Sequence, residues 1–192
     1  MEFEIKIIEF LQAGRTPFFD HAFQIISWAG SIIGFVGMLI FFLCFKKRLA
    51  FWSLFTYGFV YISVSALKLL VARVRPFNVT DTIENIGDVV HEFSFPSGHA
   101  ACSATIATFL GYFLFSHDKK PSIRVWSVLA LMTYVFLVCL SRMYLGKHYL
   151  TDLLGGIAVA GTICTLGIIL MTLYNKKRSV SNETEIEDEK FE

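Results

Sequence analysis

Residues 153–175 read LLGGIAVAGTICTLGIILMTLYN, a run without a single charged side chain. A helix needs roughly 20 mainly apolar residues to cross the hydrocarbon core of a bilayer. Four further stretches meet this requirement once polar residues at their ends are placed at the membrane interface. The five expected spans cover residues 22–45, 49–72, 98–116, 124–144 and 151–174. We therefore expect an all-α fold, a polytopic membrane helical bundle with five spanning helices.

The composition favours one membrane domain. Of the 192 residues, 55% are hydrophobic and 16% aromatic, and the mean hydropathy is +0.58. A soluble domain of this length carries less apolar material. We expect the membrane domain to cover residues 1–178 and the acidic segment 179–192 to form a disordered tail. No basic patch is interleaved with aromatic residues, so we expect no nucleic-acid partner.

The start of the chain has a different pattern. Residues 2–11, EFEIKIIEFL, mix charged side chains with bulky apolar ones. At 3.6 residues per turn this pattern is typical of an amphipathic helix. We expect this helix to lie in the membrane interface, ahead of the first span.

Basic clusters determine the expected orientation. They are Lys46–Arg48, the group Lys119, Lys120 and Arg124, and Lys176–Arg178. With five spans, all three clusters fall on one side of the bilayer. Cytoplasmic flanks of spanning helices collect Lys and Arg. We therefore expect that side, and the C-terminus, to be cytoplasmic.

The cysteines give no sign of a metal or a disulfide framework. Each lies in a different apolar run: Cys44, Cys102, Cys139 and Cys164. None belongs to a CxxC motif or to a Cys/His ligand spacing. We interpret them as small buried hydrophobic residues.

Two cations lie at the outer end of the second expected span. Lys68 and Arg75 are seven residues apart, so two helical turns place them on one face. Pro76 then stops the helix. This pair could hold an anion. The ordinary alternative is snorkelling, in which both charges simply reach the interface.

Pro96-Ser97-Gly98-His99 stands where the third expected span begins. A helix start offers unpaired backbone N–H groups and the positive end of the helix dipole. Ser97 adds a hydroxyl group, and Gly98 lets an anion approach the backbone. The arrangement suits a phosphate, although Pro and Ser also form a simple N-cap.

His148 and Asp152 lie four residues apart at the start of the fifth expected span, close to Arg142 at the end of the fourth. Side chains at this spacing are within mutual reach. An Asp bound to one imidazole nitrogen fixes the tautomer and leaves the other as a nucleophile or base. A polar pair capping an interfacial helix is the alternative. Phosphoryl transfer without a metal needs a particular set of groups. One side of this membrane domain would supply them: three cations, a helix N-terminus, two histidines and a carboxylate.

The three blocks together resemble a known family signature. They are Lys68-(six residues)-Arg75-Pro76, Pro96-Ser97-Gly98-His99, and Ser141-Arg142-(five residues)-His148-(three residues)-Asp152. They resemble the signature of the type-2 phosphatidic acid phosphatase and vanadium haloperoxidase superfamily, and the chain is similar to its small membrane lipid phosphatases. All eleven signature residues are present, in order and at the right internal spacings. Many membrane members have six spans, whereas here the amphipathic start replaces the first.

The resemblance implies a role for each residue. His148 would attack phosphorus and form a phosphohistidine, with Asp152 orienting its ring. His99 would protonate the leaving oxygen and then activate water. The phosphate oxygens would be held by five further signature residues: Lys68, Arg75, Ser97, Gly98 and Arg142. The resemblance implies neither a metal nor another cofactor.

We thus expect a metal-independent membrane lipid phosphatase. Its site would face the outer side of a membrane, and the compact size resembles bacterial members, which indicates a bacterial inner (plasma) membrane. The lipid phosphate substrate would be phosphatidylglycerophosphate, phosphatidic acid or undecaprenyl diphosphate. A lipid phosphotransferase of the same superfamily shares the covalent intermediate, and a non-catalytic anion-binding membrane protein would use the same cluster without turnover. A vanadium haloperoxidase is disfavoured, because those enzymes resemble larger soluble proteins.

Overall fold

The computed structural model describes residues 2–117 and 120–189, and these form seven α-helices and one short 3₁₀ helix without a strand. The expected all-α fold is confirmed. The helices are α1 (Glu2–Ala13), α2 (Pro17–Ala29), α3 (Ile32–Phe45), α4 (Lys47–Val71), η1 (Pro76–Asn78), α5 (Gly98–His117), α6 (Pro121–Tyr144) and α7 (Leu150–Glu189). Lys119 of the second basic cluster and residues 190–192 of the predicted tail lie outside the described residues.

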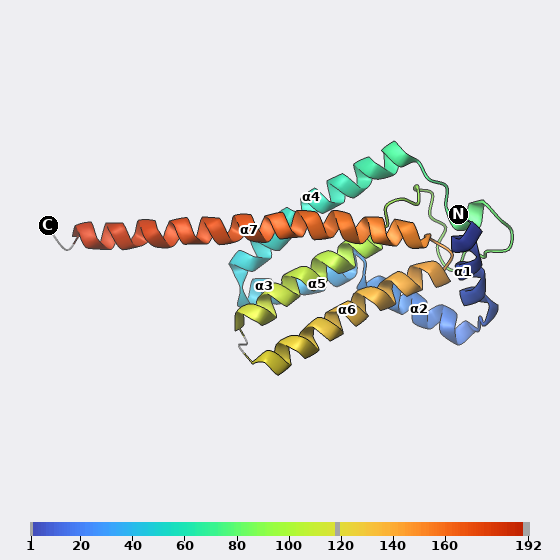
Figure 1. The fold of residues 1–192 in the computed structure, drawn as a ribbon, viewed down its shortest axis with the longest axis horizontal. Coiled ribbons are helices and arrows are strands. Elements are labelled where there is room, and N and C mark those ends of the chain that lie inside the picture. Colours follow the sequence, from blue (N-terminus) through green and yellow to red (C-terminus); the bar gives the residue numbers. More distant parts are fainter. Residues whose placement is uncertain (1, 118–119, 190–192) are drawn as a thin grey trace.

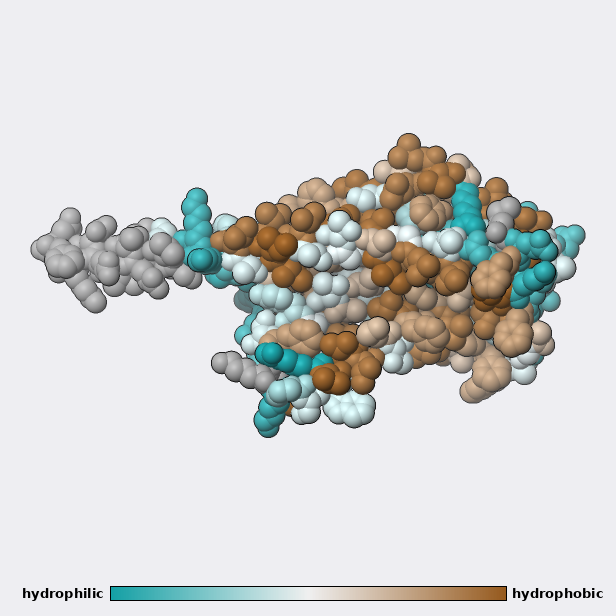
Figure 2. Space-filling model, viewed as in Figure 1, coloured by the Kyte–Doolittle hydropathy of each residue, from teal (hydrophilic) through white to brown (hydrophobic). Residues whose placement is uncertain are grey.

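Helix α5 lies in the middle of the bundle and contacts α3, α4, α6 and α7 (Figure 1). Together α5 and its neighbours form the core, which includes Phe35, Phe42, Val60, Phe109 and Cys164. The outer faces of the helices are apolar as well, and Figure 2 shows hydrophobic residues along the flanks with hydrophilic ones at both ends. Exposed apolar flanks between polar ends are the arrangement that a bilayer requires.

The spanning helices largely follow the expected boundaries. Four single helices, α4, α5, α6 and α7, are long and apolar enough to cross a membrane. A fifth span results if the bent pair α2 and α3 is counted as one. The expected count of five therefore depends on this pair, whose two helices meet at an angle of 45°.

The first expected span, 22–45, was wrong as an uninterrupted helix, because the chain breaks at Gly30-Ser31. The Ser31 hydroxyl accepts a hydrogen bond from the Ile33 backbone N–H at 3.2 Å and so caps a new helix. Gly30 faces Val138 of α6 so closely that a Cβ would lie 2.3 Å from a Val138 methyl group. Close packing on α6 and a local cap together explain the bend.

Helix α1 forms where the charge pattern predicted it, but it buries a polar face. Gln12 donates from Nε2 to the carbonyl oxygens of Glu84 at 2.9 Å and Tyr144 at 2.8 Å. Glu4 and Ile8 lie on the same buried face, while Phe3 and Phe10 remain exposed. The helix therefore docks on the protein through hydrogen bonds and directs two aromatic rings outward, as an interfacial helix would.

The acidic end of the chain differs from the expected disordered tail. Helix α7 continues beyond residue 178 to Glu189, and Figure 1 shows it projecting well past the rest of the bundle. Residues 183, 185, 187 and 189 of this segment are Glu, which has a favourable helix propensity. A helix that is already nucleated in the membrane can extend without a new nucleation cost. These two effects favour the helical continuation.

The loops at one end of the bundle bring the helix ends together. Ala72 ends α4 in the left-handed conformation, with φ of 47°, and residues 73–97 then fold back toward the start of α5. Gly146, with φ of 73°, turns the chain from α6 into α7, and a Cβ there would lie 2.5 Å from the Glu84 carbonyl oxygen. Only glycine fits both the conformation and the space. The ends of α4 and α6 thereby meet the starts of α5 and α7.

Candidate active site

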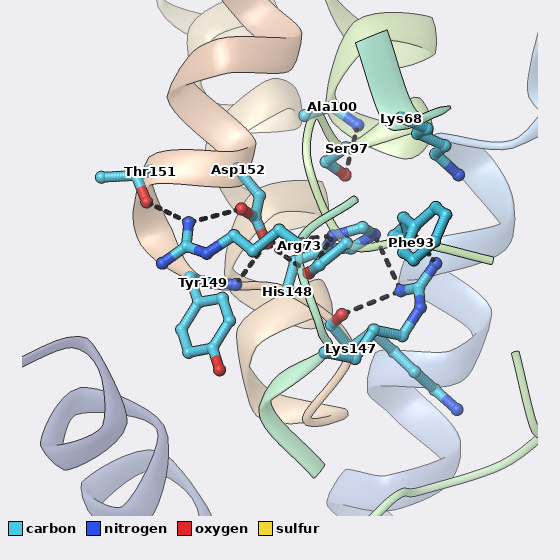
Figure 3. A network of polar contacts seen from close by, with 12 residues as sticks. Lys68, Arg73, Phe93, Ser97, Ala100, Lys147, His148, Tyr149, Thr151 and Asp152 are labelled. Carbon is cyan, nitrogen blue, oxygen red and sulfur yellow. Dashed lines mark hydrogen bonds and ion pairs between the residues drawn. The ribbon is translucent and has the colours of Figure 1, made fainter. Parts of the chain in front are cut away.

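The predicted residues converge on a cavity of about 400 Å³ at this end of the bundle. Six of the eight line it: Lys68, Arg75, Gly98, His99, Arg142 and His148. Asp152 lies directly behind His148. Ser97 is fully buried, and its hydroxyl accepts from the Ala100 backbone N–H at 3.4 Å, as Figure 3 shows. Ser97 thus caps α5 instead of lining the cavity.

His148 is held between a carboxylate and a guanidinium. Its Nδ1 lies 3.5 Å from Asp152 Oδ2, and Arg75 Nη1 approaches its Nε2 at 3.4 Å. Since a guanidinium only donates, the geometry fits the tautomer with the proton on Nδ1. Burial lowers the pKa of His148 to about 3; Asp152 opposes this shift, and the charges of Arg142 and Arg75 add to it. The ring is therefore neutral near pH 7, and its Nε2 lone pair is on the side of Arg75 and the cavity.

Asp152 has more partners than the motif indicates. Its Oδ2 accepts from Ser94 Oγ at 2.5 Å and from the Tyr149 backbone N–H at 3.0 Å. Its Oδ1 accepts from Arg73 Nη1 at 2.6 Å (Figure 3). Sequence reasoning identified neither Ser94 nor Arg73 as part of the site. Ser94 is two residues before Pro96, and no spacing rule links it to Asp152 across 58 positions.

Arg75 is fixed mainly by backbone oxygens. Its Nε donates to the Glu92 carbonyl at 2.7 Å, its Nη1 to the Lys147 carbonyl at 2.8 Å, and its Nη2 to the Phe93 carbonyl at 3.3 Å. The side chain is only 3% exposed. Neutral carbonyls orient the guanidinium without cancelling its charge. The positive charge therefore remains available to an anion in the cavity.

Arg142 reaches the cavity from the end of α6. Its Nη1 donates to Oγ of Ser27, which lies in α2, at 2.7 Å. Its buried Nε has no hydrogen-bond partner among the described residues. Buried polar groups are nearly always paired. A donor in this position suits an oxygen of a bound anion.

A glutamate shares the cavity with these cations. Glu92, from the loop before α5, forms an ion pair with Lys68, and both residues line the cavity. The hydrogen bond and the charge of Lys68 lower the pKa of Glu92, so the carboxylate is ionised near neutral pH. The motif analysis did not identify this residue. Glu92 is the one carboxylate among the described residues that line the cavity.

His99 and Gly98 form the remaining wall. A Cβ placed on Gly98 would meet no atom within 4 Å, so the start of α5 is open to the cavity. His99 is half-buried, and no hydrogen bond joins its imidazole to another described residue. In the described part of the chain, no three His, Cys, Asp or Glu side chains are grouped to hold a metal ion. The positive charge of the cavity is supplied by Lys68, Arg75 and Arg142.

The chain is similar in sequence and in fold to known proteins. The chain is 31% identical over 192 residues to a lipid A 4'-phosphatase of Porphyromonas gingivalis, an alignment that covers 93% of this chain and 76% of the relative. The crystal structure of Aquifex aeolicus LpxE superimposes with a TM-score of 0.71 at 26% identity, covering 85% of this chain and 93% of that one. A transmembrane PAP2 type phosphatidylglycerolphosphate phosphatase from Bacillus subtilis also gives 0.71, at 25% identity, with 92% and 86% covered.

The family assignment rests on the same region that forms the site. The sequence model of the PAP2 superfamily matches residues 49–177, from the start of α4 into α7. This range contains the three blocks Lys68–Pro76, Pro96–His99 and Ser141–Asp152. The chain is therefore a membrane-spanning member of the PAP2 superfamily.

Proposed function

We propose that this protein is a membrane lipid phosphatase that hydrolyses a lipid phosphate monoester or diphosphate through a phosphohistidine intermediate. The observation that carries the proposal is a neutral, buried His148 beside a cavity lined by three cations. A neutral imidazole is a nucleophile, whereas a protonated one is not. The cations supply the charge stabilisation that phosphoryl transfer needs.

In the first step, His148 Nε2 attacks phosphorus, and the bond from phosphorus to the lipid oxygen breaks. The leaving oxygen takes a proton from His99. The phosphorylated ring of His148 becomes positively charged, and Asp152 at its Nδ1 stabilises that charge. Arg75 Nη1, which lies near Nε2, would transfer its contact to a phosphate oxygen.

In the second step, water attacks the phosphohistidine, with His99 now acting as the base. The nitrogen–phosphorus bond breaks, inorganic phosphate leaves, and His148 returns to its neutral form. Protonation of His99 in the first step requires a compensating negative charge, because the cavity cations surround it. The substrate phosphate brings this charge, so substrate binding itself prepares the acid.

The phosphate oxygens would be bound by groups that still have donor capacity. These are the Nε of Arg142, the Arg75 guanidinium and the open start of α5 at Gly98. Lys68 would contribute its charge once Glu92 releases it. The hydroxyl of Ser97 would act through the helix cap that positions Gly98.

The cavity also has a wall suited to a lipid. Beyond the cations it is lined by Ile32 at the start of α3 and by Tyr57, Val60, Tyr61 and Val64 of α4. These residues belong to membrane-spanning segments. A phosphate bound by the cations could therefore keep its acyl or prenyl chain among apolar side chains. This wall favours a lipid over a small soluble phosphate ester.

We further propose that the site faces the outer side of a bacterial inner membrane. Lys46–Arg48 and Lys176–Arg178 lie at the opposite end of the bundle from the cavity (Figure 1). If these clusters are cytoplasmic, as their charge favours, the cavity faces the periplasm or the cell exterior. The candidate substrates are phosphatidylglycerophosphate, phosphatidic acid, undecaprenyl diphosphate and, from the name of a relative, lipid A 4'-phosphate.

The proposal is tested by phosphate release from these four lipids by purified protein in the presence of a chelator. We expect turnover of at least one lipid, and a loss of about 10³-fold or more in His148→Ala and His99→Ala. The matched control is His117→Ala, which changes the exposed histidine at the other end of α5. Wild-type turnover in His148→Ala would overturn the mechanism. Lipid binding without turnover would identify an anion-binding protein, and transfer to an added acceptor would identify a phosphotransferase.

A further inference from the structure

Arg73 binds the Asp152 carboxylate from outside the cavity. Its Nη1 donates to Asp152 Oδ1 at 2.6 Å and to Thr151 Oγ1 at 2.6 Å. The guanidinium carbon also lies 4.0 Å from the centre of the Tyr149 ring. Figure 3 shows Arg73 reaching across to the start of α7. Arg73 itself does not line the cavity, so it acts on the site only through other residues.

Arg73 and Arg75 contact the two ends of the same pair. Arg75 approaches Nε2 of His148, and Arg73 binds the far oxygen of Asp152. Both come from the short segment that follows α4, which is held by a hydrogen bond from the Ser94 backbone N–H to the Arg73 carbonyl at 2.8 Å. One segment thus supplies a cation to the nucleophile and another to the carboxylate that orients it.

Glu4 of α1 holds Arg73 in turn. Its Oε2 accepts from Arg73 Nη2 at 3.0 Å, and its Oε1 accepts from the backbone N–H of Thr151 at 2.9 Å and from Thr151 Oγ1 at 2.7 Å. Burial raises the pKa of Glu4, but the hydrogen bonds from Thr151 and the charge of Arg73 outweigh it, and the net shift is downward. The ionised Glu4 therefore joins α1 to Arg73 and to the first turn of α7.

The charge balance explains why Asp152 needs this partner. Its side chain has no exposed surface, and a buried carboxylate is stable only when it is paired. His148 is neutral in the free protein and 3.5 Å away, so it supplies no positive charge before the reaction. The Arg73 guanidinium at 2.6 Å does supply one. Arg75 also interacts with Asp152 through its charge, and Ser94 and the Tyr149 backbone N–H donate hydrogen bonds to it, but Arg73 is the arginine in direct contact with the carboxylate.

We infer that Arg73 is a positioning residue that keeps Asp152 ionised and correctly oriented, and that Glu4 makes the N-terminal helix α1 part of this support. The inference rests on the proposed phosphatase function. Arg73 and Glu4 do not touch the substrate. They act because the orientation and charge of Asp152 determine how well His148 attacks and how well its positively charged intermediate is stabilised.

The first test is Arg73→Gln, measured with the best lipid of the substrate panel. We expect kcat to fall by about 10²-fold, because a small displacement of a reacting group has an effect of this size. KM should change by less than about threefold, since the cavity is intact. The acid limb of the kcat profile should move to higher pH, because Asp152 loses its positive partner. Arg73→Lys should recover part of both effects.

The second test concerns α1. Glu4→Gln should lower kcat by a smaller factor, about tenfold, and should add little to Arg73→Gln, since the two residues act in one network. The control is Arg15→Gln, which removes ion pairs of Arg15 with Glu84 and Asp20 near the end of α1 without touching the site. It should leave kcat and its pH profile unchanged.

The outcomes separate this inference from the proposed function. If His148→Ala abolishes turnover but Arg73→Gln keeps the wild-type kcat and pH profile, the positioning role is wrong and the phosphatase assignment stands. A rise in KM alone would also overturn it, because it would mean direct substrate binding. If Arg15→Gln lowers kcat as much as Glu4→Gln does, then α1 contributes only stability. If His148→Ala keeps its turnover, the proposed function itself fails.

Discussion

Both ends of the bundle carry basic residues, but these residues are buried at one end and exposed at the other. At the cavity end, Arg75 and Arg142 are 3% and 6% exposed, and Lys147 is buried against Asn85 and the Asp88 carbonyl. At the other end, Lys46, Lys47 and Arg48 are exposed. Arg48 there donates a hydrogen bond of 3.2 Å to Asn175 Oδ1.

Under the proposed function, the buried cations bind the substrate phosphate and the exposed cations orient the protein in the membrane. Burying a charge costs several kcal/mol unless partners compensate, so a buried cation needs a local reason. Burial lowers the pKa of Lys147 to about 8, and the charges of Arg142 and Arg75 add to the effect. The cavity end is thus crowded with positive charge. The exposed end needs no compensation, because solvent and headgroups provide it.

The sharpest test compares the two arginines on α6. Arg142→Gln should lower kcat/KM by about 10²- to 10³-fold, because it removes a preorganised charge from the phosphate site. Arg124→Gln changes the exposed arginine near the opposite end of the same helix and should leave kcat/KM within about twofold. Phosphate-release kinetics of both variants measure the contrast. Equal losses would show that the position of the cation does not matter, and the comparison would fail.

The second test compares how a histidine at each end of the bundle, His148 and His117, contributes to the pH dependence of stability. The folded-state pKa of His148 is about 3, below the ordinary value of 6.5. Between these two values only the unfolded chain binds the proton, so the stability present above pH 6.5 is lost as pH falls toward 3. The slope from this group is at most about 1.4 kcal/mol per pH unit.

We therefore expect the melting temperature in detergent to fall between pH 7 and pH 5. His148→Gln should weaken this dependence whatever its effect on stability at pH 7. The control His117→Gln changes an exposed imidazole and should keep the wild-type slope. An unchanged slope in His148→Gln would show that the buried ring does not remain neutral.

A smaller effect is expected at the mouth of the cavity. Glu92 forms an ion pair with Lys68, so a phosphate must displace the Glu92 carboxylate before it can bind the Lys68 ammonium group. Glu92→Gln should tighten inhibition by inorganic phosphate by about two- to fivefold, because Glu92 is the exposed partner and such ion pairs are weak. The control is Glu84→Gln, because Glu84 pairs with Arg15 instead. Weaker phosphate inhibition in Glu92→Gln would mean that the glutamate supports the clamp.

The smallest effect should come from the exposed end. The double variant Lys46→Gln, Lys47→Gln should keep its turnover within about twofold, since neither residue approaches the cavity. Its effect should instead appear in cells, as a mixed orientation detected by labelling a cysteine introduced in the loop of residues 79–95 from either side. A large loss of turnover in detergent would show that the basic cluster at this end also supports the site.

The sequence predicted the helices that span the membrane with useful accuracy, because long apolar runs leave few alternatives in a bilayer. It predicted α5 from residue 98 and α7 from residue 151, and the structure begins them at Gly98 and Leu150. It did not predict the bend at Gly30-Ser31. The bend depends on how closely Gly30 packs against Val138 of another helix, and hydrophobic periodicity contains no information on that contact.

The sequence by itself identified the PAP2 family through its three blocks, which contain two histidines, an aspartate and three cations. The spacing identified the blocks, but the expected shared helix faces were wrong: α4 ends at Val71, before Arg75, and α7 begins at Leu150, after His148. Only the tertiary structure decided which other residues support them. Arg73, Ser94, Glu92 and Glu4 reach the site across 24 to 147 positions of the chain. Such contacts arise from the packing of loops and helix ends, which no local pattern encodes.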